Sequence, residues 1–185
     1  MKNIKATLPC ILTFANLSLG VTAILLAVNE SATEKISFLF FASLLVMIAA
    51  LTDRFDGKVA RMLDAASDLG KELDSLSDLI SFGVAPVIIA WKLSFTGFGV
   101  AGYLIALIFP IAGAMRLARY NITAFDNVFR GMPITMAGAF LTIDNLLDTF
   151  YSLKNRLTVY HSIVTAVLIL VLSYLMVSKI RIKKL

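Results

Sequence analysis

Between residues 53 and 78 the chain carries carboxylates at spacings that would bring them together on two helices. Asp53 and Asp56 are three residues apart, and Asp74 and Asp78 are four apart, so each pair lies on one helical face. If the two helices are antiparallel neighbours joined by a short connection, these faces meet. The spacing therefore predicts a cleft in which four carboxylates converge.

Such a cluster predicts bound cations and chemistry at phosphorus. Closely spaced carboxylates destabilise one another unless a cation is bound, and oxygen ligands without cysteine or histidine suit Mg²⁺, Mn²⁺ or Ca²⁺. Two ions held by shared carboxylates can hold the attacking and leaving oxygens of a displacement. Arg61, on the face of Asp53, has a guanidinium that suits phosphate oxygens. Gly57 and Gly70 leave room for a substrate or a second backbone.

The elements that position these residues belong to a membrane protein. The 185 residues are 59% hydrophobic and 16% charged, with a mean hydropathy of +0.87, which excludes an ordinary soluble domain. Six apolar stretches, most of them near the length that spans a bilayer, cover residues 8–29, 36–52, 79–95, 97–119, 132–150 and 157–178. We therefore expect an all-α, polytopic protein with six transmembrane helices in a single domain, residues 1–185.

The acidic segment begins where the second apolar stretch ends. That stretch, 36–52, is short, but the following DRFDGKVARML has no proline and one glycine, so its helix is expected to continue through Arg61. The third helix is expected to begin near Gly70, before the bilayer. The carboxylates then lie at the membrane surface.

The basic residues predict which surface this is. With the N-terminus inside, only Lys35, Lys92, Lys154 and Arg156 of the 17 lysines and arginines fall outside. Both termini and the acidic cluster are therefore expected to face the cytoplasm, in a multi-pass protein of the cell (inner) membrane. The basic run KIRIKK at 179–184 suits an anchor to anionic lipid headgroups and requires no nucleic acid partner.

The acidic segment also resembles the signature of a known family, the CDP-alcohol phosphatidyltransferases. Every fixed position of the signature is matched, by Asp53, Asp56, Gly57, Ala60, Arg61, Gly70, Asp74 and Asp78. Three further stretches are similar to the phosphatidylserine synthases of that family: SDLISFGVAP at 77–86, RLARYN at 116–121 and FRGMPITMAG at 129–138. The resemblance covers nearly the whole chain.

This resemblance implies an enzyme and a set of roles. It implies a six-helix bundle, usually a homodimer, that transfers the phosphatidyl group of CDP-diacylglycerol to an alcohol and releases CMP. Asp53, Asp56 and Asp74 would ligate two divalent ions, Mg²⁺, Mn²⁺ or Ca²⁺. Asp78 would complete the metal site and act as the general base. The serine branch implies L-serine as the acceptor and phosphatidylserine as the product.

The CDP-lipid is expected to contact residues from the first three helices. The resemblance places Gly57, Ala60 and Arg61 around the CDP moiety, with Gly70 close by. Asn16 lies inside the first helix, where an amide is costly unless it is hydrogen-bonded. It either joins helices, which its position favours slightly, or reaches the nucleotide.

The acceptor needs a cation for its carboxylate. Arg116 and Arg119, three residues apart at the cytoplasmic end of the fourth helix, can supply one, and Asn121 and Arg130 are near them in sequence. The alternative is that these residues anchor the protein to anionic lipids.

Three other functions compete with serine transfer. A sister enzyme would use glycerol phosphate or inositol phosphate, and it would need a more basic acceptor site. A divalent-cation transporter would need carboxylates across the bilayer midplane, whereas this cluster lies at one face. A structural subunit would have no activity. Asp144 and Asp148, near the outer end of the fifth helix, are expected to reach water.

Overall fold

The computed structural model describes residues 2–29, 35–62, 68–122, 129–178 and 181–182, with side-chain detail for 10–29, 36–54, 69–122 and 131–178. Its helices are α1 (Lys2–Val28), α2 (Lys35–Met62), α3 (Asp68–Asp78), α4 (Ala85–Ala90), α5 (Gly99–Ile122), α6 (Ile134–Leu153) and α7 (Val159–Val177). Two π-helical segments, η1 (Leu79–Val84) and η2 (Trp91–Phe95), and a 3₁₀ turn, η3 (Thr96–Phe98), join α3, α4 and α5. Strands β1 (Phe129–Arg130) and β2 (Arg181–Ile182) form an antiparallel pair. Apart from that pair, the all-α expectation is confirmed for the described residues.

The long helices make this a multi-pass membrane protein. In the described residues, four helical stretches are long and apolar enough to cross a membrane: Cys10–Val28, Ile36–Arg54, Leu69–Ile122 and Val159–Val177. The third stretch contains the turn at Gly99, whose φ of 54° is open to glycine but strained for other residues. The expected number of six crossings stays a prediction.

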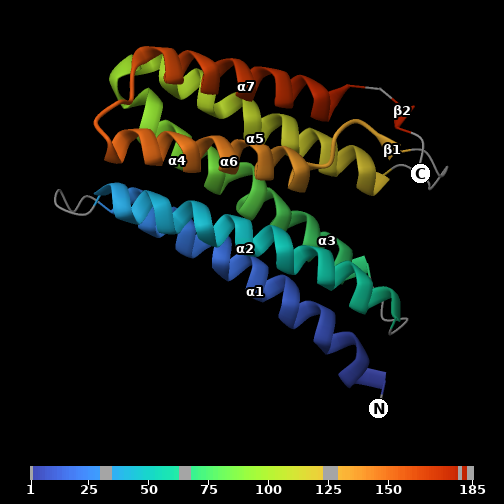
Figure 1. Ribbon diagram of the computed structural model, residues 1–185. Helices are drawn as coiled ribbons and strands as arrows, with labels where there is room; N and C mark the ends of the chain where they lie inside the picture. Colours follow the sequence, from blue (N-terminus) through green and yellow to red (C-terminus); the bar gives the residue numbers. More distant parts are fainter. Residues whose placement is uncertain (1, 30–34, 63–67, 123–128, 179–180, 183–185) are drawn as a thin grey trace.

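The helices that carry the carboxylates extend beyond the apolar stretches, as expected. α2 continues as a helix through Arg61 to Met62, and α3 begins at Asp68, two residues before Gly70. Figure 1 shows that the C-terminal ends of α2 and α5 point toward the same end of the molecule as the start of α1 and strand β2. We call this the site end of the bundle.

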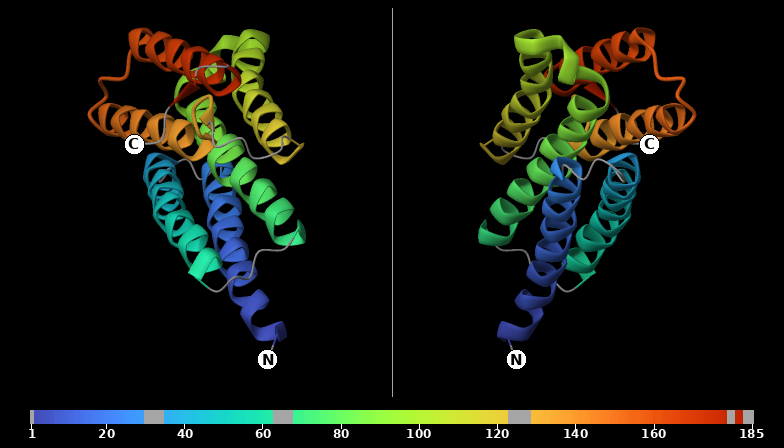
Figure 2. Two further views of the ribbon diagram at one scale, coloured as in Figure 1. Left: turned by 90° about the vertical axis from the view of Figure 1, so that its right-hand side faces the viewer. Right: turned by 90° about the vertical axis from the view of Figure 1, so that its left-hand side faces the viewer.

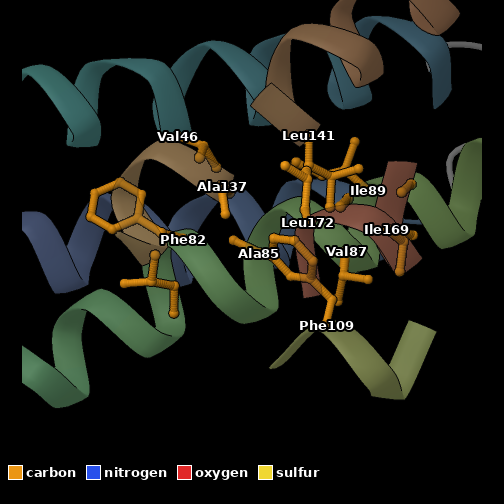
Figure 3. Close-up of a cluster of buried hydrophobic side chains, with 14 of the residues drawn as sticks. Val46, Phe82, Ala85, Val87, Ile89, Phe109, Ala137, Leu141, Ile169 and Leu172 are labelled. Atoms are coloured by element: carbon orange, nitrogen blue, oxygen red, sulfur yellow. The ribbon is translucent and has the colours of Figure 1, made fainter. Parts of the chain in front are cut away.

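The helices pack as two groups that meet at α4 and α6. α1 packs along α2 and against α3, and α5 pairs with α7, while α6 contacts α2, η1 and α4 (Figures 1 and 2). The core lies where these elements meet, and its buried side chains include Phe82, Phe109, Leu141 and Ile169 (Figure 3).

Small residues let the helices approach closely, as is typical of membrane bundles. A methyl group on Gly20 of α1 would overlap Ser81 Oγ and lie 2.8 Å from Ser81 Cα. One on Gly138 of α6 would lie 2.5 Å from the carbonyl oxygen of Phe82. Both glycines are thus required for close packing against η1, which directly follows Asp78.

The π-helical geometry of η1 has a local cause. Pro86 has no N–H with which to bond the carbonyl of Phe82, so the regular α-helical ladder is interrupted there. The chain uses a wider bond instead, with Ala85 N–H donating to Ile80 O. Asp78 therefore lies at the junction between α3 and this widened turn.

Candidate metal centre and acceptor site

Three of the four predicted carboxylates converge at the site end. Asp53 of α2 and Asp74 and Asp78 of α3 each offer a carboxylate oxygen, and these oxygens all lie within 4.8 Å of one another. The convergence arises because α2 and α3 both pack against α1. The structure thus places Asp53, Asp74 and Asp78 together, as the spacing predicts.

The remaining residues of the acidic motif belong to the last turns of α2. Asp56, Gly57, Ala60 and Arg61 follow Asp53 on this helix, but their side chains lie outside the described residues. Their roles stay predictions. Gly70 lies in the first turn of α3, one turn before Asp74.

The described carboxylates fit a divalent cation. Asp78 Oδ1 is buried, and in the described part of the chain no hydrogen-bond donor reaches it. A buried carboxylate oxygen without a donor is costly unless a bound ligand satisfies it. Oxygen ligands alone suit Mg²⁺, Mn²⁺ or Ca²⁺, so the donor set agrees with the predicted metals.

Two serines fix the backbone on either side of Asp78 to α1. Ser77 Oγ donates to the carbonyl of Thr13 at 3.2 Å, and Ser81 Oγ donates to the carbonyl of Asn16 at 3.0 Å. Both serines are fully buried. They position Asp78 without using its own oxygens.

Arg116 of α5 joins this site. Its guanidinium interacts electrostatically with Asp78, and its Nε is buried without a hydrogen-bond acceptor among the described residues. α5 packs against η1, which brings the arginine to the acidic cluster. Arg116 therefore offers a donor to an anionic ligand beside Asp78.

The other predicted acceptor residues have different surroundings. Arg119 Nη1 donates to the carbonyl of Val177 at the end of α7, at 3.0 Å. The side chain of Asn121 bonds Glu72 and Ser75 of α3. Arg130 lies in β1, and its side chain is outside the described residues. Of the contacts described for these four residues, the one with Asp78 belongs to Arg116.

Asn16 is completely buried in α1, and neither atom of its amide finds a partner within the described residues. The interhelical side-chain bond that its position slightly favours is therefore not seen there. Its backbone carbonyl instead accepts the hydrogen bond from Ser81. An unpartnered buried amide favours the alternative role, contact with a ligand.

The expectation that Asp144 and Asp148 reach water is wrong for Asp148. That residue is only 4% exposed, and Ser94 Oγ donates to its Oδ2 at 3.1 Å. Thr165 Oγ1 lies 2.7 Å from Asp144 Oδ2 and 3.2 Å from Asp148 Oδ2. The partners come from η2 and α7, so spacing within one helix could not reveal them.

Comparison with known proteins agrees with this geometry. Residues 6–181 match the family model described as CDP-alcohol phosphatidyltransferase. The chain is 37% identical over 175 residues to the CDP-diacylglycerol–serine O-phosphatidyltransferase of Bacillus subtilis (strain 168), covering 94% of this chain and 88% of that protein.

Two further relatives carry related names. The Helicobacter pylori (strain ATCC 700392 / 26695) protein with the same name is 42% identical over 110 residues, which cover 58% of this chain and only 46% of that relative. The archaetidylserine synthase of Methanothermobacter thermautotrophicus is 34% identical over 177 residues, covering 94% of this chain and 68% of that protein. The match of the family model over residues 6–181 shows that this chain belongs to the CDP-alcohol phosphatidyltransferase family.

Proposed function

We propose that this protein transfers the phosphatidyl group of CDP-diacylglycerol to the hydroxyl of L-serine, giving phosphatidylserine and CMP. The relatives from Bacillus subtilis and Helicobacter pylori are both named CDP-diacylglycerol–serine O-phosphatidyltransferase, which supports serine as the acceptor. The observation that carries the proposal is the convergence of Asp53, Asp74 and Asp78 beside Arg116. This arrangement places carboxylate ligands for a cation beside a guanidinium that can donate to an anion.

The carboxylates have two roles in this proposal. Asp53, Asp56, Asp74 and Asp78 hold two divalent ions, Mg²⁺, Mn²⁺ or Ca²⁺. When bound, such ions stabilise the negative charge of the pyrophosphate as Lewis acids. Asp78 is also the catalytic base: one of its carboxylate oxygens would ligate an ion, and the other would accept the proton of the serine hydroxyl.

The reaction is a substitution at the phosphorus that bears diacylglycerol. Asp78 accepts the hydroxyl proton as the serine oxygen forms a bond to this phosphorus. The bond from phosphorus to the oxygen of CMP breaks, and CMP leaves with the electron pair. Arg116 binds the serine carboxylate through its guanidinium, which suits a planar anion. The same charge lies close to Asp78, so the acceptor is held beside its base.

The CDP moiety occupies the other side of the carboxylates. Gly57, Ala60 and Arg61 at the end of α2 and Gly70 in α3 surround it. The buried amide of Asn16 contributes a donor and an acceptor that have no other described partner. Arg119, Asn121 and Arg130 are assigned to the acceptor end of the site, where Arg119 and Asn121 act through the helices that they bond, α7 and α3.

The lipid substrate explains why the enzyme is a membrane protein. Its acyl chains stay in the bilayer while its CDP group enters the cluster at the membrane surface. We propose six crossings by a single domain, residues 1–185, in a homodimer. The protein lies in the cell (inner) membrane, and both termini and the site face the cytoplasm. Serine reaches the site from the cytoplasm, and CMP is released into it.

CMP release by the purified full-length protein tests this function. With CDP-diacylglycerol and Mn²⁺ or Mg²⁺ in detergent, we expect release that depends on serine and stops with a chelator. The Asp78→Asn variant keeps the size of the side chain but loses the base, so its rate should fall at least about 100-fold. Glycerol 3-phosphate and inositol phosphate are the competing acceptors.

Each outcome of this assay has a distinct meaning. Release with another acceptor and not with serine would keep the phosphatidyltransferase chemistry and overturn the proposed role of Arg116. No release with any acceptor, from folded protein, would contradict the proposed enzyme. Equal rates for Asp78→Asn and the unmodified protein would remove Asp78 from the mechanism.

A further inference from the structure

A set of polar contacts joins the end of α5 to the middle of α3. Asn121 Nδ2 lies 3.2 Å from each carboxylate oxygen of Glu72 and 3.0 Å from Ser75 Oγ, and donates to both side chains. Ser75 Oγ also lies 3.4 Å from Asn121 Oδ1. We call Lys71, Glu72, Ser75 and Asn121 the α3–α5 clasp.

Lys71 also bonds the end of α5. Its Nζ donates to the backbone carbonyl of Asn121 at 3.3 Å and lies 5.8 Å from the centre of the Tyr120 ring. Carbonyls in the last turn of a helix have no partner within the helix, and a cation there is favourable. The clasp therefore bonds both the side chain and the backbone of Asn121.

The clasp contacts α3 next to the proposed metal ligands. Ser75 is adjacent to Asp74 and three residues before Asp78, and Glu72 is two residues before Asp74. α3 is the N-terminal end of the helical stretch Leu69–Ile122, and its carboxylates repel one another and Asp53. Bonds from neighbouring helices to this end of the stretch help to hold the ligands in place against the repulsion.

The chemical type of Asn121 suits this task. Its amide donates to Glu72 without adding a charge, so it holds α3 while leaving the negative charge of the carboxylates available to a cation. A lysine or arginine at this position would add a competing positive charge beside the site. An aspartate would repel Glu72.

We propose that Asn121 is a positioning residue that holds α3 through Glu72 and Ser75, so that Asp74 and Asp78 stay opposite Asp53. This inference rests on the proposed metal role of those carboxylates, and it assigns Asn121 a role other than contact with serine. Residues that orient metal ligands typically change metal affinity about 10- to 100-fold when they are altered.

An exchange of acid and amide tests the clasp. Asn121→Asp places two carboxylates against each other, whereas the double variant Asn121→Asp with Glu72→Gln restores an amide donor and a carboxylate acceptor with the same total charge. Mn²⁺ binding to the purified full-length protein, measured by electron paramagnetic resonance of the free ion, reports on the site without activity. Asn155→Asp, an exposed position in the α6–α7 connection, is the matched control for added charge.

We expect Asn121→Asp to bind Mn²⁺ about 10- to 100-fold more weakly, and the double variant to recover most of this loss. Asn155→Asp should bind like the unmodified protein. Thermal unfolding identifies variants that fail to fold, and for these the milder Asn121→Ala takes the place of Asn121→Asp. The KM for serine should follow the Mn²⁺ affinity and recover in the double variant.

Three outcomes would overturn the inference. Unchanged Mn²⁺ affinity in folded Asn121→Asp and Asn121→Ala would show that the clasp does not position the ligands. A raised KM for serine that the double variant does not recover, with Mn²⁺ binding intact, would assign Asn121 to the acceptor. If the unmodified protein and Asp78→Asn bind Mn²⁺ equally weakly, the proposed metal site itself fails, and the role of Asn121 fails with it.

Discussion

At the scale of single residues, the two arginines of the RLARYN segment differ in their described contacts. Arg116 Nε is buried beside Asp78 without an acceptor in the described residues, whereas Arg119 donates to the end of α7. The carbonyl of Leu175 in the same turn accepts from the N–H of Met132 at 3.1 Å. Arg119 thus belongs to a set of donors that satisfy the last carbonyls of α7.

This contrast gives a prediction for serine binding. Arg116→Lys keeps the charge but loses the planar pair of donors, so the KM for serine should rise about 10- to 100-fold, as for a lost hydrogen bond to a charged group. The KM for CDP-diacylglycerol should change little. Steady-state CMP release with each substrate varied in turn measures both constants.

Arg119→Lys is the matched control for this prediction. The same substitution at Arg119 should lower the thermal stability of the bundle, because Arg119 bonds the end of α7. It should raise the KM for serine less than Arg116→Lys does. A larger rise in KM for Arg119→Lys than for Arg116→Lys would reverse the assignment of the two residues.

Helical periodicity put Asp74 and Asp78 on one face of α3, and the assumption that α2 and α3 are neighbours then predicted their meeting with Asp53. It could not predict the partners of Asn121 or Asp148. Those partners lie 46 to 54 residues away, or 17 residues away in the case of Thr165, and they belong to other helical segments, so only the packing of helices reveals them. The position of Asn121, two residues after Arg119, indicated only that both lie at the same helix end, and the packing shows that their described contacts are with α3 and α7.

At the scale of elements, η1 links the acidic helix to the core. It follows Asp78 directly, and it packs against α1, α5 and α6. The absence of proline between residues 53 and 61 predicted the continuation of α2 correctly. The widening at η1 was not predicted, because Pro86 can end, kink or widen a helix, and the neighbours that allow one of these are distant in sequence.

The crossing of α1 and η1 can be tested with Gly20→Ala. The added methyl group would overlap Ser81 Oγ, so α1 and η1 must move apart. We expect a loss of about 1 to 3 kcal/mol in the free energy of unfolding, typical of overpacking, and weaker activity because Ser81 is three residues from Asp78. Unfolding by detergent titration and CMP release measure the two effects.

Gly97→Ala is the control for this change. A methyl group at Gly97 would meet no atom within 4 Å, and this glycine lies in η3 at the opposite end of the bundle. The Gly97→Ala variant should have the same free energy of unfolding and the same rate of CMP release as the unmodified protein. Equal stability of the Gly20 and Gly97 variants would mean that α1 and η1 can separate at little cost.

At the scale of the whole molecule, the two ends of the bundle differ in their chemistry. The site end carries the C-terminal ends of α2 and α5 and the start of α3, while the α6–α7 connection and η3 lie at the other end (Figure 1). Between them, large apolar side chains such as Leu104 of α5 and Val167 of α7 are exposed and suit contact with lipid chains. The distribution of lysine and arginine predicted that the site end is cytoplasmic.

Cysteine labelling in intact cells tests this orientation. Cys10 is the single cysteine, so Cys10→Ser gives a background into which one thiol is placed at a time. Arg156→Cys is exposed in the α6–α7 connection, and Leu69→Cys is 71% exposed in the first turn of α3. A membrane-impermeant maleimide should label Arg156→Cys in intact cells but label Leu69→Cys only after the membrane is opened. The reverse pattern would place the carboxylates outside, where serine and CDP-lipid made in the cytoplasm do not meet them, and it would contradict the proposed function together with the orientation.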